Sequence, residues 1–162
     1  MTTSTTAPFT DEQLAALAQP LPRHLVKTRA ADRGRAVAYL EGYTAIEQAN
    51  AIFGYGRWGM RVDVMQYTPL SDQGAGLYTA TVTVTVEGCH DAQDVGTCAV
   101  RSATPDQHDM AVKGAVTDAM KRALRHYGDQ FGNALYGKDA PAVPVPTTTR
   151  ATPQASYRAR TA

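Results

Sequence analysis

Lys121, Arg122 and Arg125 are the residues of this sequence best suited to chemistry. They fall within a narrow arc of a helix expected over residues 104–128, where Asp118 is the one acid among them. The helix pattern alone leaves two interpretations open. The arc is a solvated polar face, or it is a track for a polyanion, since arginine forks and lysine charge both suit phosphate.

The helix that carries these cations has clear end signals and an apolar face. Thr104 is expected as the N-cap, Pro105 at the first helical position and Gln107 as the partner in a capping box. Gly128 is placed to end the helix in the left-handed conformation. The face opposite the cations requires a core, and its residues are Val112, Ala115, Val116, Ala119, Ala123 and Tyr127.

The core for that face comes from strands with alternating polarity. Residues 58–67, 77–86 and 92–101 read as strands with short connections, which predicts an antiparallel meander. Residues 35–40 form a further short strand. The expected class is α+β, a three-to-four-stranded antiparallel β-meander packed on one face by the long C-terminal helix (a β-β-β-α core).

Two shorter helices are expected before the meander. Thr10 caps a helix over residues 11–18, and Thr44 opens a second helix that stops at Gly54. Residues 21–27 are expected as a connector or a single helical turn, and residues 30–34 as a loop.

Composition restricts where a polyanion can bind. The formal net charge is +1, but residues 140–162 contain three arginines and no acid, which leaves the remainder net negative. Any nucleic-acid binding must therefore come from clustered cations. We expect one folded domain over residues 10–139, flanked by a disordered N-terminal tail (1–9) and a disordered basic Pro/Thr-rich tail (140–162). No membrane-length apolar run or signal peptide is recognised, so a cytoplasmic, nucleoid-associated location is expected.

The sequence offers no catalytic signature. Residues 132–139 nearly match a phosphate-binding loop, but Asp139 stands where a magnesium-binding hydroxyl is needed. No zinc, nucleophile-elbow or paired-carboxylate pattern is found, and Cys89 and Cys98 are expected to be reduced thiols. The expectation is a protein that is no enzyme, with no catalytic residue, metal or cofactor.

Three further residues are candidates for a binding surface. Tyr55 and Arg57 lie in a glycine-rich turn, and Arg61 follows in the next strand. Aromatic rings stack on bases and cations hold the backbone of single-stranded nucleic acid. The alternatives stay open: Tyr55 as a core or interface aromatic, and the two arginines as solvent-facing strand residues.

Four segments in order resemble the annealing domain of the Rad52 DNA-repair family. They are YLEG at 39–42, ANAIFGYGRW at 49–58, AVTDAMKRALR at 115–125 and FGNAL at 131–135. The resemblance covers residues from about 9 to 139. The chain is similar to a compact bacterial or phage member of that family.

The resemblance implies a ring of many subunits that holds single-stranded DNA in a basic groove and anneals complementary strands without ATP, in recombination and double-strand break repair. Lys121, Arg122, Arg125 and Tyr55 match groove positions of the family, whereas Thr44 stands where eukaryotic members have a basic residue. Arg101 and Lys113 are weaker candidates for a second, outer DNA site.

The implied partners are single-stranded DNA and further copies of the chain, with a recombinase or single-strand-binding protein as an additional candidate. An alternative function is a recombination mediator module that loads a partner recombinase or replication protein.

Overall fold

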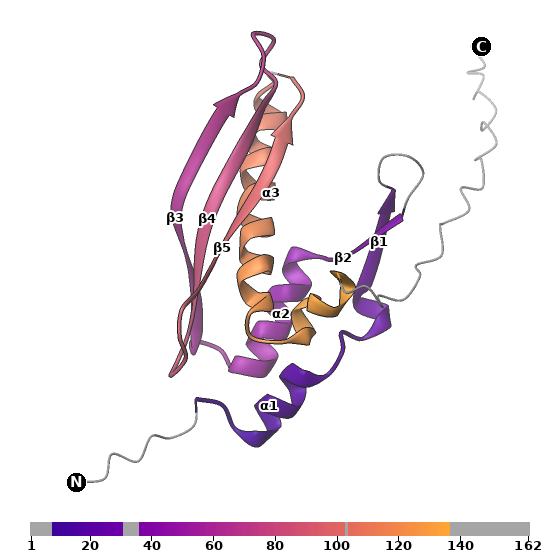
Figure 1. The fold of residues 1–162 in the computed structure, drawn as a ribbon, viewed down its shortest axis with the longest axis vertical. Helices are drawn as coiled ribbons and strands as arrows, with labels where there is room; N and C mark the ends of the chain where they lie inside the picture. Colours follow the sequence, from indigo (N-terminus) through magenta and orange to yellow (C-terminus); the bar gives the residue numbers. More distant parts are fainter. Residues whose placement is uncertain (1–7, 31–35, 103, 137–162) are drawn as a thin grey trace, which may run out of the picture.

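The three-stranded sheet and the long helix are the main layers of the molecule. The computed structural model describes residues 8–30, 36–102 and 104–136. Strands β3 (Trp58–Pro69), β4 (Gly76–Val86) and β5 (Ala92–Val100) form an antiparallel sheet in the order β3-β4-β5. Helix α3 (Pro105–Arg125) packs along one face of this sheet (Figure 1). The α+β class, the meander and the position of the helix are confirmed.

Close packing between α3 and the strands depends on small residues. Ala80, Val82 and Val84 of the central strand β4 are fully buried on the α3 side. At Gly96 of β5, a Cβ atom would overlap the backbone of α3. The helix can therefore lie nearly in contact with the strand backbone, where its own buried residues are Ala111, Ala115, Ala119, Met120, Ala123 and Leu124.

A β-bulge reverses the side-chain pattern of β3. Met60 and Val62 pair with Val84 and Val82 on the α3 side, but the register shifts between Val62 and Val64. Val64 then pairs with Thr81, on the outer face of the sheet, away from α3. The expected alternation through Val64 is wrong at this point, because one extra residue in a bulge moves the following side chains to the other face.

The strand expected over residues 35–40 is present as β2 (Ala36–Leu40), but it does not join the meander. It pairs with β1 (Val26–Ala30), which was expected as connector and loop, in a separate antiparallel hairpin. Figure 1 shows this hairpin on the side of α3 opposite the three-stranded sheet. The meander therefore has three strands, and β1 was missed because its sequence, VKTRA, shows no apolar alternation.

Helices α1 (Asp11–Ala18) and α2 (Gly42–Phe53) cover the lower end of the core. The capping box at Thr10 is confirmed. Helix α2 begins earlier than expected, with Glu41 as its N-cap, and Thr44 is buried in its first turn instead of capping it. Its expected end at Gly54 is confirmed, with a φ of 94° that favours glycine.

The ends of α3 differ in detail from the expectation. Thr104 is the N-cap residue, but its side chain makes no capping bond, and Gln107 accepts a hydrogen bond from the Ser102 amide instead (3.0 Å). Gly128 has an extended backbone (φ 165°), so the left-handed termination is wrong, and α3 ends at Arg125. Two short 3₁₀ turns follow, η3 (Asp129–Phe131) and η4 (Asn133–Tyr136).

Candidate nucleic-acid interface

The three helix cations point to two different neighbours. Lys121 faces the hairpin, where its Nζ atom donates a hydrogen bond to the Leu40 carbonyl (3.0 Å). Arg125 lies one turn further along the same side of α3. Arg122 turns toward β5, and its Nε atom lies 3.1 Å from Asp94 Oδ1. Within one chain, Lys121 and Arg125 therefore belong to one site and Arg122 to another.

The hairpin adds a cation and an aromatic ring to the Lys121 site. Two cations lie over the ring of Tyr39, which belongs to β2. Lys121 Nζ is 5.9 Å from the ring centroid, and Arg29 Cζ is 5.7 Å from it. We call Arg29, Lys121 and Arg125, with the Tyr39 ring between the hairpin and the helix, the Tyr39 cation cluster. Both distances are within the range of a cation–π interaction.

Arg29 was missed by the sequence prediction because the strand that positions it was missed. In β1, Lys27 and Arg29 alternate with Thr28, and Lys27 pairs directly with Tyr39. The alternating cations, followed after a short gap by the apolar residues 36–40, are the signal that could have indicated a basic hairpin.

The electrostatics of the Tyr39 cation cluster favour an anion. Burial lowers the pKa of Lys121, and the charges of Arg125 and Arg29 lower it further, against the opposing effect of Asp118. Like charges are thus held close together around a half-buried ammonium group. An anionic ligand such as a phosphate would relieve this repulsion and raise the pKa of Lys121.

Arg122 forms part of a polar cluster at the edge of β5. The Asp94 carboxylate forms an ion pair with Arg122 and lies 3.2 Å from His126 Nε2. It also accepts a hydrogen bond from the Val95 amide (2.7 Å). Burial opposes ionisation of Asp94, but the Val95 amide, Arg122 and His126 outweigh it, so the pKa of Asp94 lies below its usual value.

Tyr55 and Arg57 lie at the other end of α2 from the hairpin. Tyr55 is 86% exposed in the turn after the helix, and Arg57 forms an exposed ion pair with Glu87 (3.3 Å). The 12 residues of α2 separate this turn from Tyr39 by about 18 Å, at about 1.5 Å per residue. The structure therefore does not bring these two residues together with Lys121 in a single chain.

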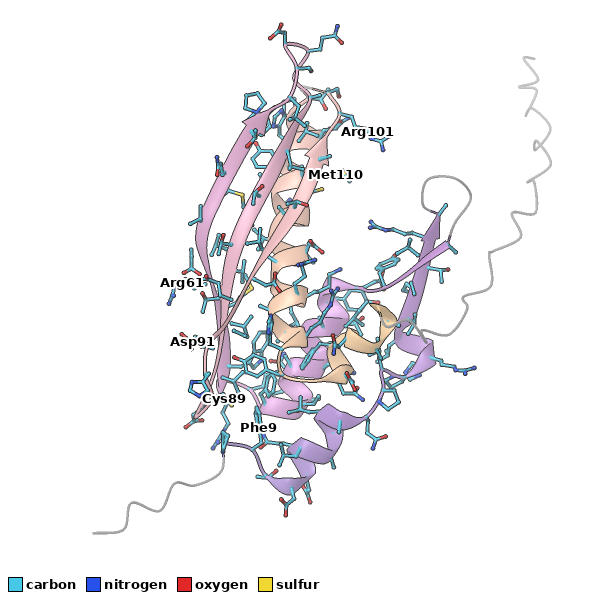
Figure 2. All side chains as sticks on the ribbon, in the orientation of Figure 1. Phe9, Arg61, Cys89, Asp91, Arg101 and Met110 are labelled. Carbon is cyan, nitrogen blue, oxygen red and sulfur yellow. The ribbon has the colours of Figure 1, made fainter. Side chains whose placement is uncertain are left out.

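The remaining predicted residues lie on other surfaces. Arg61 projects from β3 on the outer face of the sheet and forms an ion pair with Asp63 (2.6 Å) (Figure 2). Arg101 lies at the far end of the sheet, beyond β5, near the start of α3. Lys113 forms an ion pair with Asp109 one turn away on α3 (2.6 Å). These three residues do not share a surface with the Tyr39 cation cluster.

A separate open pocket of about 810 Å³ lies at the turn between β4 and β5. Its lining includes Phe9, Cys89, His126 and Tyr127. Tyr127 shares its hydroxyl hydrogen between the carbonyls of Val84 (3.1 Å) and His90 (2.9 Å), and burial raises its pKa to about 12. This tyrosine therefore stays protonated and ties the turn after α3 to the sheet.

Among residues 8–30, 36–102 and 104–136, no cluster of three or more His, Cys, Asp or Glu side chains is arranged to hold a metal ion. In the same part of the chain, no helix is both long and apolar enough to cross a membrane.

The fold and the Tyr39 cation cluster define a small α+β protein. One side of its long helix packs against a sheet, and the other side carries cations. Residues 10–152 match the model of the Rad52/22 family of double-strand break repair proteins. The chain therefore belongs to the Rad52/22 family.

Curated relatives are consistent with this assignment. The chain is 39% identical over 109 residues to the DNA repair and recombination protein RAD52 of Saccharomyces cerevisiae, a match that covers 64% of this chain and 23% of the relative. It is 34% identical over 144 residues to the DNA repair and recombination protein rti1 of Schizosaccharomyces pombe, covering 80% of this chain and 38% of that protein. The chain thus spans well under half the length of these relatives.

Proposed function

We propose that this protein binds single-stranded DNA and anneals complementary strands without ATP, in recombination and double-strand break repair. Membership of the Rad52/22 family supports the proposal, and the names of its relatives place those proteins in DNA repair and recombination. The single observation that carries it is the Tyr39 cation cluster, because arginine and lysine side chains grouped within residues 1–139, which are net negative as a whole, indicate a polyanionic ligand.

The proposed mechanism needs no bond-making residue. Contacts to phosphates fix the path of a strand without reading its sequence. A strand held by its phosphates keeps its bases accessible to a complementary strand, and each stacked base-pair step then contributes about 1.4 kcal/mol. The protein has only to neutralise charge, keep the strand extended and bring two strands together.

We further propose that the chain assembles into a ring of many subunits. Support comes from β3, where Met60, Val62 and Met65 face the α3 side of the sheet but remain 41%, 41% and 38% exposed. Their neighbours on β4 are fully buried, because α3 packs on β4 and β5. Apolar side chains that face a core but lack cover suit contact with a second copy.

Repetition of the site around an assembly would compensate for the few cations per subunit. Each subunit contributes the Tyr39 cation cluster, and linked sites bind far more tightly than one site alone. Arg122, Tyr55 and Arg57 remain candidate contacts along the path of the strand. Arg61, Arg101 and Lys113, which lie on other surfaces, are candidates for a further DNA contact.

Strand annealing without ATP tests the proposal directly. Complementary oligonucleotides carrying a fluorophore and a quencher are mixed with the wild-type protein and with a Lys121→Ala/Arg125→Ala variant at two salt concentrations. We expect accelerated, salt-sensitive annealing by the wild-type protein and a large loss in the variant. Equal acceleration by both proteins would move the DNA site away from α3. No acceleration by folded wild-type protein would reject annealing and favour the partner-loading function.

A further inference from the structure

The Asp94 carboxylate of β5 contacts two side chains of α3, one with each oxygen. Its Oδ1 atom lies 3.1 Å from Arg122 Nε, and its Oδ2 atom lies 3.2 Å from His126 Nε2. His126 is the C-cap residue of α3 and keeps helical backbone angles (φ −63°, ψ −21°), so it lies one turn beyond Arg122 on the same face of the helix. We call Asp94, Arg122 and His126 the Asp94 cluster.

Strand β5 fixes the position of the shared acid. Asp94 pairs with the buried Val82 of β4, so its side chain projects toward α3. The Val95 amide donates a hydrogen bond to Asp94 Oδ1 (2.7 Å) and holds the carboxylate in place. The pKa of Asp94 lies below its usual value of 3.8, so the group carries its full charge near neutral pH. That charge is therefore shared between the two helix side chains.

The net charge of the Asp94 cluster depends on the His126 imidazole. Histidine is the side chain that ordinarily changes charge between about pH 5 and 8, whereas arginine stays protonated. The other titratable groups around His126 line the pocket at the β4–β5 turn and are Cys89, His90, Asp91 and Tyr127. Burial raises the pKa of the Cys89 thiol and raises that of Tyr127 to about 12, so both stay neutral in this range. His90 is thus a second imidazole of the same pocket.

We propose that His126 is a positioning residue for Arg122, and that protonation of its imidazole shifts Asp94 from Arg122 toward His126 and opens the guanidinium group to a DNA phosphate. This inference rests on the proposed DNA binding, in which Arg122 is a candidate contact. An imidazolium binds a carboxylate more strongly than a neutral imidazole does, because the hydrogen bond is then charge-assisted. A phosphate then competes for Arg122 with a carboxylate that has a second cation beside it.

Protonation also makes the Asp94 cluster positive. With a neutral imidazole the charges of Arg122 and Asp94 cancel, whereas with an imidazolium one positive charge remains, which attracts phosphate. By linkage, bound DNA must favour protonated His126, so affinity rises as the pH falls through the range in which the imidazole takes up its proton. Since all three side chains are partly exposed, we expect at most about a fivefold change in affinity.

The pH dependence of DNA binding tests the role of His126. Anisotropy of a fluorescent oligothymidine is measured at about pH 5.5 and about pH 7.5, at constant ionic strength, for the wild-type protein, His126→Gln and His90→Gln. We expect tighter binding at the lower pH for the wild-type protein and His90→Gln, and nearly equal affinity at both values for His126→Gln. His90 is the matched control, because it is an exposed imidazole of the same pocket whereas Asp94 contacts His126. A wild-type pH response in His126→Gln would overturn the proposal.

Two further variants show whether His126 acts through Asp94. Asp94→Asn removes the shared acid, so Arg122 should be accessible at both pH values and most of the pH response should disappear. A full response in Asp94→Asn would mean that the imidazolium meets the phosphate directly, and the positioning role would be rejected. His126→Lys places a permanent charge beside Asp94 and should give the acidic-pH affinity at both pH values. A folding defect cannot produce that gain, and its absence would also reject the proposal.

These outcomes are separable from those that test the proposed function. If the wild-type protein anneals strands and binds oligothymidine with the same affinity at both pH values, regulation by His126 is rejected and the proposed function stands. If the wild-type protein binds oligothymidine at neither pH, DNA binding is rejected and the inference fails with it.

Discussion

The Asp94 carboxylate lies 3.1 Å from the Nε atom of Arg122, so an acid of the same chain already contacts a cation that we propose as a DNA contact. Both side chains are partly exposed, at 25% and 46%. An incoming phosphate must therefore compete with Asp94 for this arginine. Lys121 is in a different position, since it donates a hydrogen bond to a neutral acceptor, the Leu40 carbonyl.

Asp94→Asn should strengthen binding of single-stranded DNA. The substitution removes the competing charge, and an exposed ion pair is worth about 0.2–1 kcal/mol, which corresponds to at most about a fivefold change in affinity. Anisotropy titrations at moderate salt would measure it. Asp72→Asn is the matched control, because it removes the same charge from an exposed aspartate in the turn between β3 and β4. Equal strengthening by both variants would indicate a general charge effect.

The same carboxylate should contribute to stability at acidic pH. Because the pKa of Asp94 is lowered in the folded state, its contribution is present above the usual aspartate value of 3.8 and is lost as the pH falls through the lowered value. Urea unfolding between pH 5 and about pH 2 should therefore show a shallower decline for Asp94→Asn than for wild type. Parallel curves would contradict the assigned ion pairs.

Binding of single-stranded DNA should weaken at alkaline pH because of Lys121. Its pKa is lowered below the usual 10.5, so the ammonium group loses its proton earlier than an exposed lysine as the pH rises. Only the charged form attracts phosphate. Lys121→Arg, which stays charged, should retain affinity across the same range, as measured by anisotropy at constant ionic strength. Identical pH profiles would exclude Lys121 from the DNA site.

Gly96→Ala should destabilise the fold. A Cβ atom at this position would overlap the backbone of Ala115 and Ala119, so β5 and α3 must move apart. Overpacking of this kind costs about 1–3 kcal/mol, which thermal unfolding would detect. Gly59→Ala is the control, because its Cβ would meet only the Thr85 hydroxyl at an ordinary 3.8 Å. A similar melting temperature for both variants would contradict the close packing of helix and strand.

Val62→Glu should reduce the size of the assembly. Val62 is 41% exposed on the α3 side of β3, and a carboxylate buried between two copies would lack a partner. Light scattering after gel filtration should show a shift toward the 17.4 kDa monomer. Val95→Glu, at 44% exposure on the outer face of β5, is the control and should leave the assembly intact. The reverse result would place the subunit contact on the outer face.

The long elements of this fold could be predicted because local pattern and tertiary packing agree. The threonine–valine alternation of β4 and the apolar face of α3 each require one buried side, and the structure supplies it. The bulge after Val62 could not be predicted, since no glycine or proline marks it. Thr44 misled the prediction because a threonine can cap a helix or be buried inside it, and only the packing decides.

The candidate site was predicted in part for a similar reason. Helical spacing places Lys121 and Arg125 on one side of α3, and the structure agrees. The separation of Arg122 from Lys121 depends on Asp94 and Leu40, which lie 28 and 81 residues away along the chain. Arg29 depends on the pairing of β1 with β2, and β1 has no apolar alternation that predicts a strand.

The separateness of the hairpin has a consequence for local unfolding. Since β1 and β2 contact each other far more than they contact any other element, the part of the hairpin before the buried Leu40 forms a small cooperative unit that can open while the three-stranded sheet stays intact. Backbone amides in β1 and β2 should therefore exchange with deuterated solvent well before those of β4. A ligand that orders this unit would slow hydrogen exchange throughout the hairpin, including at amides that the ligand itself does not contact.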